Sequence, residues 1–341
     1  MIRLSQGTAA CLGLKKIRID AAPTTAYLLH GERCRMSCAF CPQAGGKGAK
    51  GEPGAKETTG TAHRLGRVTW SPFSRQELLT RLPRAAPGGL KRICIQGVKS
   101  PAGNAELLQF IKEVKVVSTL PLCVSTWVES EADVAQLFEA GVERVSIALD
   151  AVNPLAYTRF KKGSLQRRSD LLLNCARLWP GRMSTHIIVG LMETEEECVT
   201  LMEKLLQTGI RVALFAFTPL KGTALVAHPA PQLGTYRRIQ AARFLLEKQL
   251  VTCSAMRFQD GRIQFFGLSG TLLREYLRDG TAFQTSGCPD CNRPYYNERP
   301  GGVMYNYPRP LTGTEVKEAI QCVSGNEGKE ASHGRKLAGH L

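Results

Sequence analysis

The feature that most constrains the fold is the alternation of short apolar runs with helical stretches along most of this 341-residue chain. The runs are apolar almost throughout, which is typical of parallel strands buried on both faces of a sheet. They lie at 25–30, 92–96, 122–127, 144–149, 185–189 and 212–217. Helices between such strands form right-handed crossovers, which bring the ends of all strands to one mouth. The sequence therefore predicts an α/β fold, a (β/α) TIM-type barrel, partial or complete, with N- and C-terminal extensions.

Capping signals indicate where two of the helices begin. The segment SEAD at 130–133 opens a helix that ends before Gly141, and the capping box TEEE at 194–197 opens one that ends at Gly209. A third helix is expected at 232–250, and further strands are expected at 252–256 and 263–266.

Three segments depart from this rhythm and set the expected domain boundaries. Residues 44–60 are rich in Gly and Lys, which predicts a flexible insertion. The last residues are polar and basic, which predicts a disordered tail. The expected organisation is an N-terminal extension at 1–23, a barrel at 24–286 that carries the insertion, a cysteine-containing segment at 287–323 and the tail at 324–341.

The chain is strongly basic, with 45 Lys and Arg against 29 Asp and Glu and a net charge of +16. Such an excess favours an acidic partner, whether a nucleic acid, a carrier protein or an anionic small molecule. A hydrophobic share of 43% suffices for a large core, which excludes a disordered or fibrous chain. No apolar run approaches the ~20 residues of a membrane span and no signal peptide is visible, so a cytoplasmic protein is expected.

Cysteine usage is the second unusual feature, because the chain contains 12 cysteines. In a cytoplasmic protein, clustered cysteines more often bind metal, whereas scattered ones are small buried hydrophobic residues. Four scattered cysteines lie in apolar runs or on a helix face and are expected in the core: Cys94, Cys123, Cys175 and Cys198.

The first cluster of cysteines is the segment CRMSCAFC, in which Cys34, Cys38 and Cys41 follow directly on the first predicted strand. Three thiolates on one loop can bind three irons of a 4Fe–4S cluster and leave the fourth iron open to an exogenous ligand. A structural zinc site or a closed electron-transfer cluster would need a fourth Cys or His. His30 is nearby, but its place at the strand end is more typical of a packed residue. The spacing therefore favours an iron–sulfur cluster with one vacant iron.

A C-x3-C-x-aromatic-C loop after the first strand of a (β/α) barrel resembles the radical SAM superfamily. The resemblance implies that S-adenosyl-L-methionine (SAM) chelates the free iron and is cleaved to a 5′-deoxyadenosyl radical, which removes hydrogen from an unactivated carbon. It implies these SAM-binding residues: Phe40 near the adenine, Gln96 and Gly97 at the amino group, Asp150 at the ribose, and Val189 and Gly190 against the adenine. Asp150 is equally consistent with a helix N-cap, and the acidic residue usual beside Gly97 is missing. No catalytic side chain is assigned.

The second cluster is the pair Cys288 and Cys291, in a segment rich in Pro, Tyr and Asn. A C-x2-C pair can hold zinc, bind an auxiliary iron–sulfur cluster or form a redox disulfide. The disulfide is disfavoured because the pair does not open a helix. Zinc would need two partners, for which Cys322 and His333 are candidates, and an auxiliary cluster would need one or two more ligands, for which Cys11 is a candidate. The auxiliary cluster is the favoured interpretation.

Three segments carry a closer resemblance, to the biotin-synthase-related branch of radical SAM proteins and, within it, to the two-component (archaeal-type) lipoyl synthases. These segments are PTTAYLLHGERCRMSCAFCPQA, RVTWSPF and GCPDCNRPYYNERPGGVMYNYPRPLT. The resemblance implies a radical SAM sulfurtransferase that inserts sulfur into an octanoyl chain in lipoate biosynthesis, with a second cluster at Cys288 and Cys291 as the sulfur source. The implied partners are an acidic octanoylated lipoyl carrier protein, a second lipoyl synthase component and a reducing electron donor. The upstream cysteine triplet of single-protein lipoyl synthases is absent, which leaves the auxiliary ligand set open.

Other hypotheses remain open at this stage. Biotin synthase-like chemistry or another radical SAM C–H functionalisation would use the same first cluster. A tRNA methylthiotransferase is disfavoured because only 33 residues, with one cysteine, precede Cys34. The non-enzyme alternative is a basic nucleic-acid module with structural zinc, but the sequence lacks the aromatic–basic interleaving that such binding favours. We expect neither a nucleic acid nor a membrane as partner.

Overall fold

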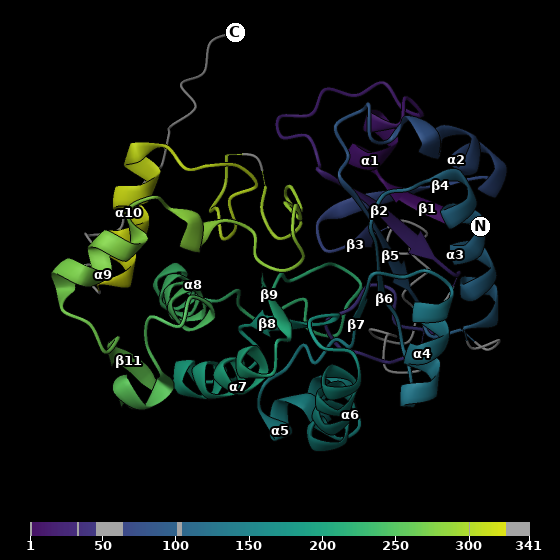
Figure 1. Cartoon of the computed structure of the whole chain (residues 1–341). Coiled ribbons are helices and arrows are strands. Elements are labelled where there is room, and N and C mark those ends of the chain that lie inside the picture. The colour runs from purple at the N-terminus through teal and green to yellow at the C-terminus, as the bar shows by residue number, and fades with distance from the viewer. Residues whose placement is uncertain (1, 33, 46–63, 101–103, 300, 325–341) are drawn as a thin grey trace, which may run out of the picture.

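A curled sheet of nine strands organises the chain (Figure 1). The structure, a computed structural model, describes residues 2–32, 34–45, 64–100, 104–299 and 301–324. In spatial order its strands are β3 (Arg64–Leu65), β4 (Val68–Phe73), β1 (Ile2–Ser5), β2 (Thr25–His30), β5 (Arg92–Gly97), β6 (Leu122–Ser125), β7 (Arg144–Ser146), β8 (Met183–Val189) and β9 (Arg211–Ala216). The insertion expected at 44–60 and the tail expected at 324–341 lie almost entirely outside the described residues.

The six strands predicted from the sequence are all present and form the parallel part of the sheet, from β2 through β9. The result is a half-barrel, so the predicted partial (β/α) TIM-type fold is confirmed. Three strands of this sheet, β1, β3 and β4, were not predicted. β1 comes from the expected N-terminal extension and pairs antiparallel with both β2 and β4, which lengthens the sheet beyond the parallel strands.

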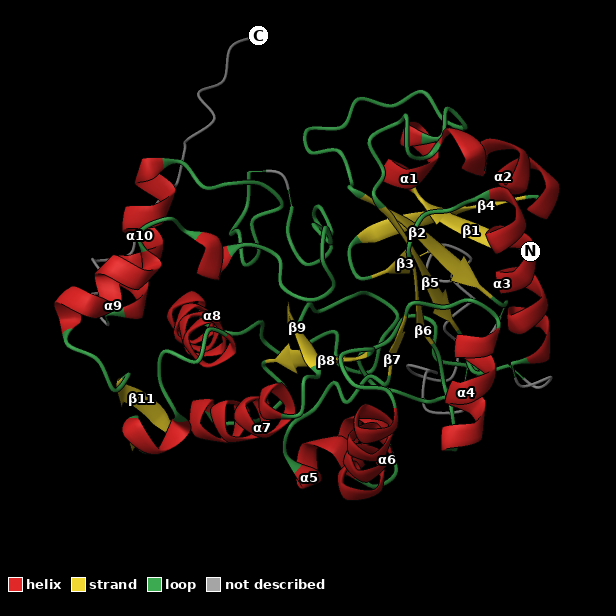
Figure 2. Ribbon diagram, viewed as in Figure 1, coloured by secondary structure: helices red, strands yellow, loops and turns green. Residues whose placement is uncertain are grey.

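Helices cover the outer face of the sheet, and the last two helices of the chain lie beyond that layer (Figure 2). They are α1 (Gln6–Cys11), α2 (Arg75–Arg81), α3 (Ala105–Val117), α4 (Glu131–Glu139), α5 (Pro154–Ala156), α6 (Leu165–Leu178), α7 (Glu195–Gln207), α8 (Leu233–Glu247), α9 (Gly270–Leu277) and α10 (Gly313–Val323). Both predicted capping boxes are confirmed at the starts of α4 and α7. Gly141 and Gly209 follow these two helices with positive φ, as expected for helix ends. No helix in the described part of the chain combines the length and the apolar composition that a membrane crossing needs.

The strand predicted at 252–256 is wrong. Cys253–Ala255 forms a short 3-10 helix, and β10 (Arg257–Gln259) begins only after it. The strand predicted at 263–266 is confirmed as β11 (Arg262–Phe265), which pairs antiparallel with β10. The reason is the turn between them, where Asp260 and Gly261 both have positive φ (50° and 72°). An Asp-Gly turn of this kind matches the twist of a two-stranded ribbon and fixes which residues pair.

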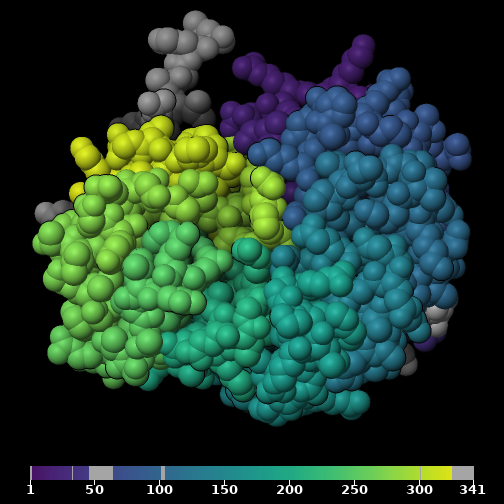
Figure 3. All heavy atoms as spheres, in the orientation of Figure 1, coloured from purple at the N-terminus to yellow at the C-terminus, as the bar shows by residue number. Residues whose placement is uncertain are grey.

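The open side of the half-barrel is filled by the segment 284–307, which we call the closing segment. Figure 3 shows the C-terminal residues against the N-terminal ones on one face of the molecule. Hydrogen bonds tie the segment to β9 on one side and to residues beside β2 and β4 on the other: Leu214 N to Ser286 Oγ (2.9 Å), Asn297 Nδ2 to the Ala216 carbonyl (2.8 Å), Thr24 N to Asn292 Oδ1 (3.0 Å) and Arg67 N to the Tyr296 carbonyl (2.8 Å). Irregular chain therefore stands where a complete barrel would have further strands.

A buried ion pair joins α7, α8 and β11. Arg238 Nη2 lies 2.6 Å from Glu195 Oε1, and both side chains are at most 5% exposed. Glu195 Oε2 also accepts a hydrogen bond from Ile263 N at 2.9 Å. Because the carboxylate binds a guanidinium and a backbone donor at once, its removal leaves Arg238 without its charged partner, with only a hydrogen bond to Thr235 Oγ1 among the described residues, and leaves Ile263 N without this acceptor.

We expect Glu195→Ala to lower the free energy of unfolding by about 3 kcal/mol or more, since it leaves a buried charge uncompensated. Urea denaturation followed by circular dichroism measures this loss. The control is Glu275→Ala, which removes one partner of an exposed ion pair with Arg278 and should cost less than about 1 kcal/mol. Equal losses in the two variants would contradict the structural role of the buried pair.

Candidate active site

A cavity of about 750 Å³ occupies the interior of the half-barrel. Its wall consists of inward-facing residues of the parallel strands, the loop after β2, the closing segment, and residues from 5–7, 17–21 and 64–70. The volume lies within the usual range of cofactor and ligand sites. In (β/α) barrels, active sites lie at the ends of the strands where the chain leaves for the helices, so this cavity is the candidate active site.

The loop after β2 brings the three predicted cluster ligands to this cavity. Cys34, Cys38 and Cys41 all lie on its wall. Backbone hydrogen bonds anchor the loop to two neighbouring segments: Arg35 N to the Lys99 carbonyl (2.9 Å) and Ala39 N to the Phe160 carbonyl (2.7 Å). The loop is thus held from both sides although it belongs to no helix or strand.

Burial dominates the environment of these thiols. It raises the pKa of Cys38 to about 12, and it raises the pKa of Cys41 well above the ordinary value, with the neighbouring Cys38 thiol adding to the rise. Thiolates held this close would repel one another. These three cysteines could therefore be thiolates together only if they bound a positively charged group.

An ion pair that was not predicted lies beside the cysteine loop. Lys161 ends the π-helix Tyr157–Lys161, and its Nζ lies 2.7 Å from Asp150 Oδ2 and also donates to the Ala148 carbonyl. Lys161 and Asp150 are 6% and 14% exposed, and both line the cavity. The sequence offers no signal for Lys161, because two adjacent lysines at a helix end are typical of a solvated surface.

The structure also decides between the two interpretations of Asp150. The N-cap of α5 is Asn153, whose side chain accepts a hydrogen bond from Ala156 N at 2.8 Å. Asp150 instead has a positive φ of 63°, and its carboxylate is paired with Lys161 on the cavity wall. The N-cap interpretation is wrong, and Asp150 lies where a cavity ligand can reach it.

The other residues predicted to bind SAM fall into two groups. Phe40, Gln96 and Gly97 line the cavity. Val189 is fully buried in the core instead, and Ile188 lines the cavity, because adjacent residues of a strand face opposite sides of the sheet. Gly190 has a φ of 105° and approaches Phe217 and Pro231 so closely that a Cβ would lie 3.0 Å from the proline ring. It is absent from the described cavity wall.

His186 lies on the same wall and was not predicted. Burial lowers the pKa of its imidazole to about 4, so the ring is neutral near pH 7. Its Nε2 lies 3.3 Å from Ser146 Oγ, and its ring meets the edge of Phe215. The opposite charge of Asp150 raises the pKa but does not offset burial. The cavity thus contains a neutral donor and acceptor beside the Asp150–Lys161 pair.

The predicted auxiliary pair lies deeper in the barrel than the cysteine loop. Cys288 and Cys291 line the cavity, and so does Cys94 of β5. The Sγ atoms of Cys288 and Cys123 are 3.4 Å apart. Burial is the main cause that raises the pKa of Cys94 well above its ordinary value, and the two closing-segment thiols add to the rise. The expectation that Cys94 is an ordinary core residue is therefore wrong, because the inner face of a half-barrel faces a cavity. Cys123 is buried, as expected, but its thiol lies against that of Cys288.

The remaining cysteines lie elsewhere. Cys175 and Cys198 are fully buried in helices that pack on the sheet, so their prediction as core residues is confirmed. Cys11 ends α1, and the structure does not place it on the cavity wall with Cys288. Cys322 lies in α10, also away from that wall, and His333 falls outside the described residues.

Together the fold and the site define a (β/α) half-barrel enzyme with a three-cysteine loop at the mouth of its cavity. The radical SAM superfamily matches residues 28–205, which is more than half of the chain. The chain belongs to the radical SAM superfamily. This membership makes it an enzyme, so the alternative of a zinc-binding nucleic-acid module is wrong.

Solved structures agree with this fold. HydG, a maturase of the FeFe-hydrogenase, matches with a TM-score of 0.52 and 12% identity over 65% of this chain and 50% of that chain. HydG from Carboxydothermus hydrogenoformans matches with a TM-score of 0.50 and 12% identity, over 66% and 51%. Methylornithine synthase (PylB) has a TM-score of 0.48 and 14% identity, over 66% and 62%. The chain spans about half the length of the HydG structures, and identities this low show the fold alone. No curated protein matches the chain significantly.

The residues of the site fit the cofactors of the superfamily, a 4Fe–4S cluster and SAM. Three thiols on one loop meet at the cavity, and their buried, mutually repelling arrangement suits a cationic iron cluster. Among the described residues, no three Cys, His, Asp or Glu side chains converge as tightly as a single metal ion requires. Thiolates that bind different irons of one cluster need no such convergence. When bound, the cluster and SAM supply a carbon radical, and the protein supplies position and exclusion of water.

Replacement of Cys34, Cys38 and Cys41 by alanine should abolish the cleavage of SAM. These three thiolates would bind three irons of the cluster and leave the fourth iron free for SAM, and without them this cluster is not bound. Anaerobically reconstituted protein is assayed for bound iron and for 5′-deoxyadenosine. The control is Cys253→Ala, a partly buried thiol that lies beside Thr200 and away from the cavity wall. Unchanged 5′-deoxyadenosine formation in the triple variant would refute the assignment of these ligands.

The two adjacent lysines provide a matched pair for a second test. Lys161→Met removes the partner that holds the Asp150 carboxylate, whereas the exposed Lys162→Met leaves the pair intact. We expect the first change to weaken SAM binding about tenfold, in line with the loss of one buried charge-assisted hydrogen bond. Equilibrium dialysis of SAM measures the dissociation constants. Equal constants for the two variants would show that the fixed carboxylate does not contribute to SAM binding.

Proposed function

We propose that the protein is a lipoyl synthase component, a radical SAM sulfurtransferase that inserts sulfur into an octanoyl chain on a lipoyl carrier protein. One observation supports the proposal above all others: two separate sets of thiols face one cavity. Cys34, Cys38 and Cys41 lie on the loop after β2, and Cys288 and Cys291 lie on the closing segment. Hydrogen abstraction alone would require the first set and not the second.

The wall between the two sets suits a saturated chain. Much of it is apolar or aromatic, and it includes Leu29, Phe40, Val98, Ile188, Phe215, Phe217 and Tyr296. Burying methylene groups against such a wall is favourable by about 0.8 kcal/mol each. The same side chains exclude water, which would otherwise compete for a reactive carbon centre. The described residues thus offer an apolar space with sulfur ligands at two levels.

The charge of the protein supports an acidic protein partner. The exposed arginines on the cavity wall are Arg18, Arg64 and Arg299, and the chain as a whole carries a net charge of +16. An acidic lipoyl carrier protein would be attracted to this rim, which raises the rate of encounter. The resemblance to two-component lipoyl synthases further supports a second synthase component and a reducing electron donor as partners.

The test is an anaerobic reaction of the full chain with SAM, a strong reductant and an octanoyl-lysyl carrier protein, with and without a second synthase component. We expect a thiolated octanoyl chain, detected by mass spectrometry of the carrier. Controls are the variant without Cys34, Cys38 and Cys41, and a carrier with an unmodified lysine. Dethiobiotin in place of the carrier tests the biotin synthase-like alternative. Formation of 5′-deoxyadenosine without any thiolated carrier would reject sulfur insertion and leave radical SAM chemistry intact.

A further inference from the structure

We propose that Cys94, Cys123, Cys288 and Cys291 form one four-thiolate site for an iron–sulfur cluster inside the barrel. We call it the inner cysteine site. The assignment deepens the proposed function, because it names the ligand set of the sulfur-donating centre. It depends on the proposed function only for that role, since metal binding at these four thiols stands on geometry alone.

Two of the four thiols stand side by side on adjacent strands. Cys94 of β5 and Cys123 of β6 are register partners. In the same row, Tyr27 of β2 is the partner of Cys94, and Arg144 of β7 is the partner of Cys123. Paired residues of parallel strands point to the same face of the sheet. Because Tyr27 and Cys94 line the cavity, the whole row faces the interior of the barrel.

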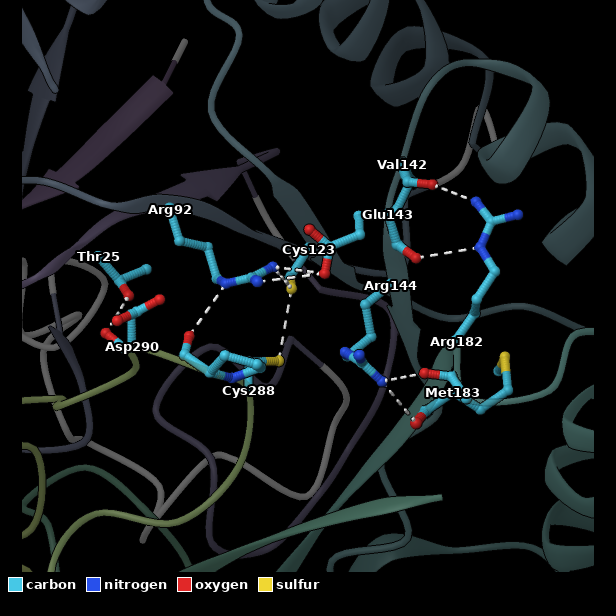
Figure 4. A network of polar contacts seen from close by, with 12 residues as sticks. Thr25, Arg92, Cys123, Val142, Glu143, Arg144, Arg182, Met183, Cys288 and Asp290 are labelled. Carbon is cyan, nitrogen blue, oxygen red and sulfur yellow. Dashed lines mark hydrogen bonds and ion pairs between the residues drawn. The ribbon is translucent and has the colours of Figure 1, made fainter. Parts of the chain in front are cut away.

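The closing segment brings the other two thiols onto this row. Cys288 Sγ lies 3.4 Å from Cys123 Sγ, and Figure 4 shows the two side chains facing each other. Cys291 and Cys94 pack against the same small cluster around Tyr27, whose hydroxyl lies 3.5 Å from Cys291 Sγ. Thiols that are up to 197 positions apart along the chain thus meet at one level of the barrel, which random burial of cysteines would not produce.

The position of Gly287 explains how the closing segment comes so close. Gly287 has a φ of 127°, and a Cβ at this residue would lie 3.0 Å from the Cβ of Ala213 in β9. Only glycine accepts this backbone conformation and this approach without strain. The C-x2-C turn can therefore press against the open side of the sheet and face the row that contains Cys123.

Arginines surround the inner cysteine site. Arg92 Nη1 lies 3.0 Å from Cys123 Sγ, and its Nε donates to the Pro289 carbonyl at 3.1 Å. Figure 4 places Arg92 and Arg144 on either side of Cys123. Arg144 is 7% exposed, and its buried Nε has no hydrogen-bond partner among the described residues. Four thiolates with cluster sulfides carry a net negative charge, which buried guanidinium groups offset. Glu143 Oε1 pairs with Arg92 Nη2 at 3.1 Å and offsets part of this positive charge, whereas the printed contacts of Arg144 are backbone carbonyls, those of Gly181 and Met183.

Zinc and a disulfide fit the site less well than a cluster. Zinc needs its thiolates at about 2.3 Å from one ion, and no three ligand side chains in the described ranges meet so closely. The 3.4 Å between Cys123 and Cys288 exceeds the roughly 2.05 Å of a disulfide bond. An iron–sulfur cluster holds only one or two thiolates on each iron, so it does not need three ligand side chains to converge on one ion.

The location of the inner cysteine site suits a sulfur donor. Gln96 follows Cys94 by two residues along β5, a rise of about 7 Å, and donates from Nε2 to Cys94 Sγ at 3.1 Å. Gln96 lies near the strand end, towards the loop that carries the first three cysteines. The inner cysteine site is therefore one layer deeper in the barrel than the strand ends, and part of the cavity lies between the two sets of thiols.

The test removes the first cluster and examines the second. The full chain with Cys34, Cys38 and Cys41 replaced by alanine is reconstituted anaerobically with iron and sulfide. It should retain one cluster, roughly four irons per chain if the cluster is 4Fe–4S. In this background, Cys94→Ser and Cys123→Ser should lose the iron and the visible absorption as completely as Cys288→Ser and Cys291→Ser. The matched controls are Cys11→Ser and Cys253→Ser, which should keep both.

Retained iron after Cys94→Ser and Cys123→Ser, with loss after Cys288→Ser and Cys291→Ser, would overturn the four-thiolate assignment. Binding of zinc alone, or of no metal in the triple-alanine background, would overturn it as well.

Serine nearly preserves side-chain volume, and an unchanged circular dichroism spectrum separates ligand loss from misfolding. If unfolding accompanies either serine change, alkylation of single thiols in wild-type protein with and without iron gives a second readout. All four thiols should be protected only with iron. If the serine variants lose iron as expected but the wild-type enzyme forms no thiolated carrier, the four-thiolate assignment stands and the proposed substrate is rejected.

Discussion

The structure depends on the docking of the closing segment against the last strand of an incomplete barrel. β9 is the last strand of the curled sheet, so the backbone groups along its free edge have no neighbouring strand. Burying such groups without hydrogen-bond partners would cost free energy. Ser286 accepts from Leu214 N, and Asn297 donates to the Ala216 carbonyl, so polar side chains replace a neighbouring strand. The same segment separates the cavity from solvent on that side and carries two of its thiols. One set of contacts therefore completes the fold and builds the deeper half of the site.

The parallel part of this fold could be predicted because its strands are apolar on both faces and are separated by capped helices. The antiparallel edge could not be predicted so readily. β1 has four residues, and β4 contains Pro72, which is usually a sign against a strand. Both become strands because they pair with each other, and β1 pairs with β2, over contacts that no local pattern reveals. The first strand of the ribbon after α8 was misplaced by a few residues because the Asp-Gly turn, rather than the apolar residues, fixes the pairing.

The candidate site divides in the same way. Cysteines that lie close together in sequence, on the loop after β2 and in the C-x2-C turn, were identifiable from spacing. Cys94, Cys123 and Lys161 could not be identified as site residues in this way. The two cysteines lie side by side because of the strand register, and Lys161 lies beside Asp150 because of the path of the chain between them. A signal for the strand cysteines was nevertheless present. Cys94 and Gln96 alternate with isoleucines, and Cys123 and Ser125 alternate with other apolar residues, which indicates a polar inner face in strands that otherwise look wholly buried.

The distance along the chain between Cys123 and Cys288 has a consequence for how such a protein matures. The loop after β2 holds its thiols within eight residues, whereas 165 positions separate the pair that meets across the barrel. During synthesis from the N-terminus, the local set exists long before the distant set can assemble. Metal binding to ligands that come together only on folding adds its free energy to folding. A cluster at the inner cysteine site would therefore stabilise the barrel only after the closing segment has docked. The ligands of the loop after β2 would therefore be available to iron and sulfide before those of the inner cysteine site, which lie together only once the chain is complete.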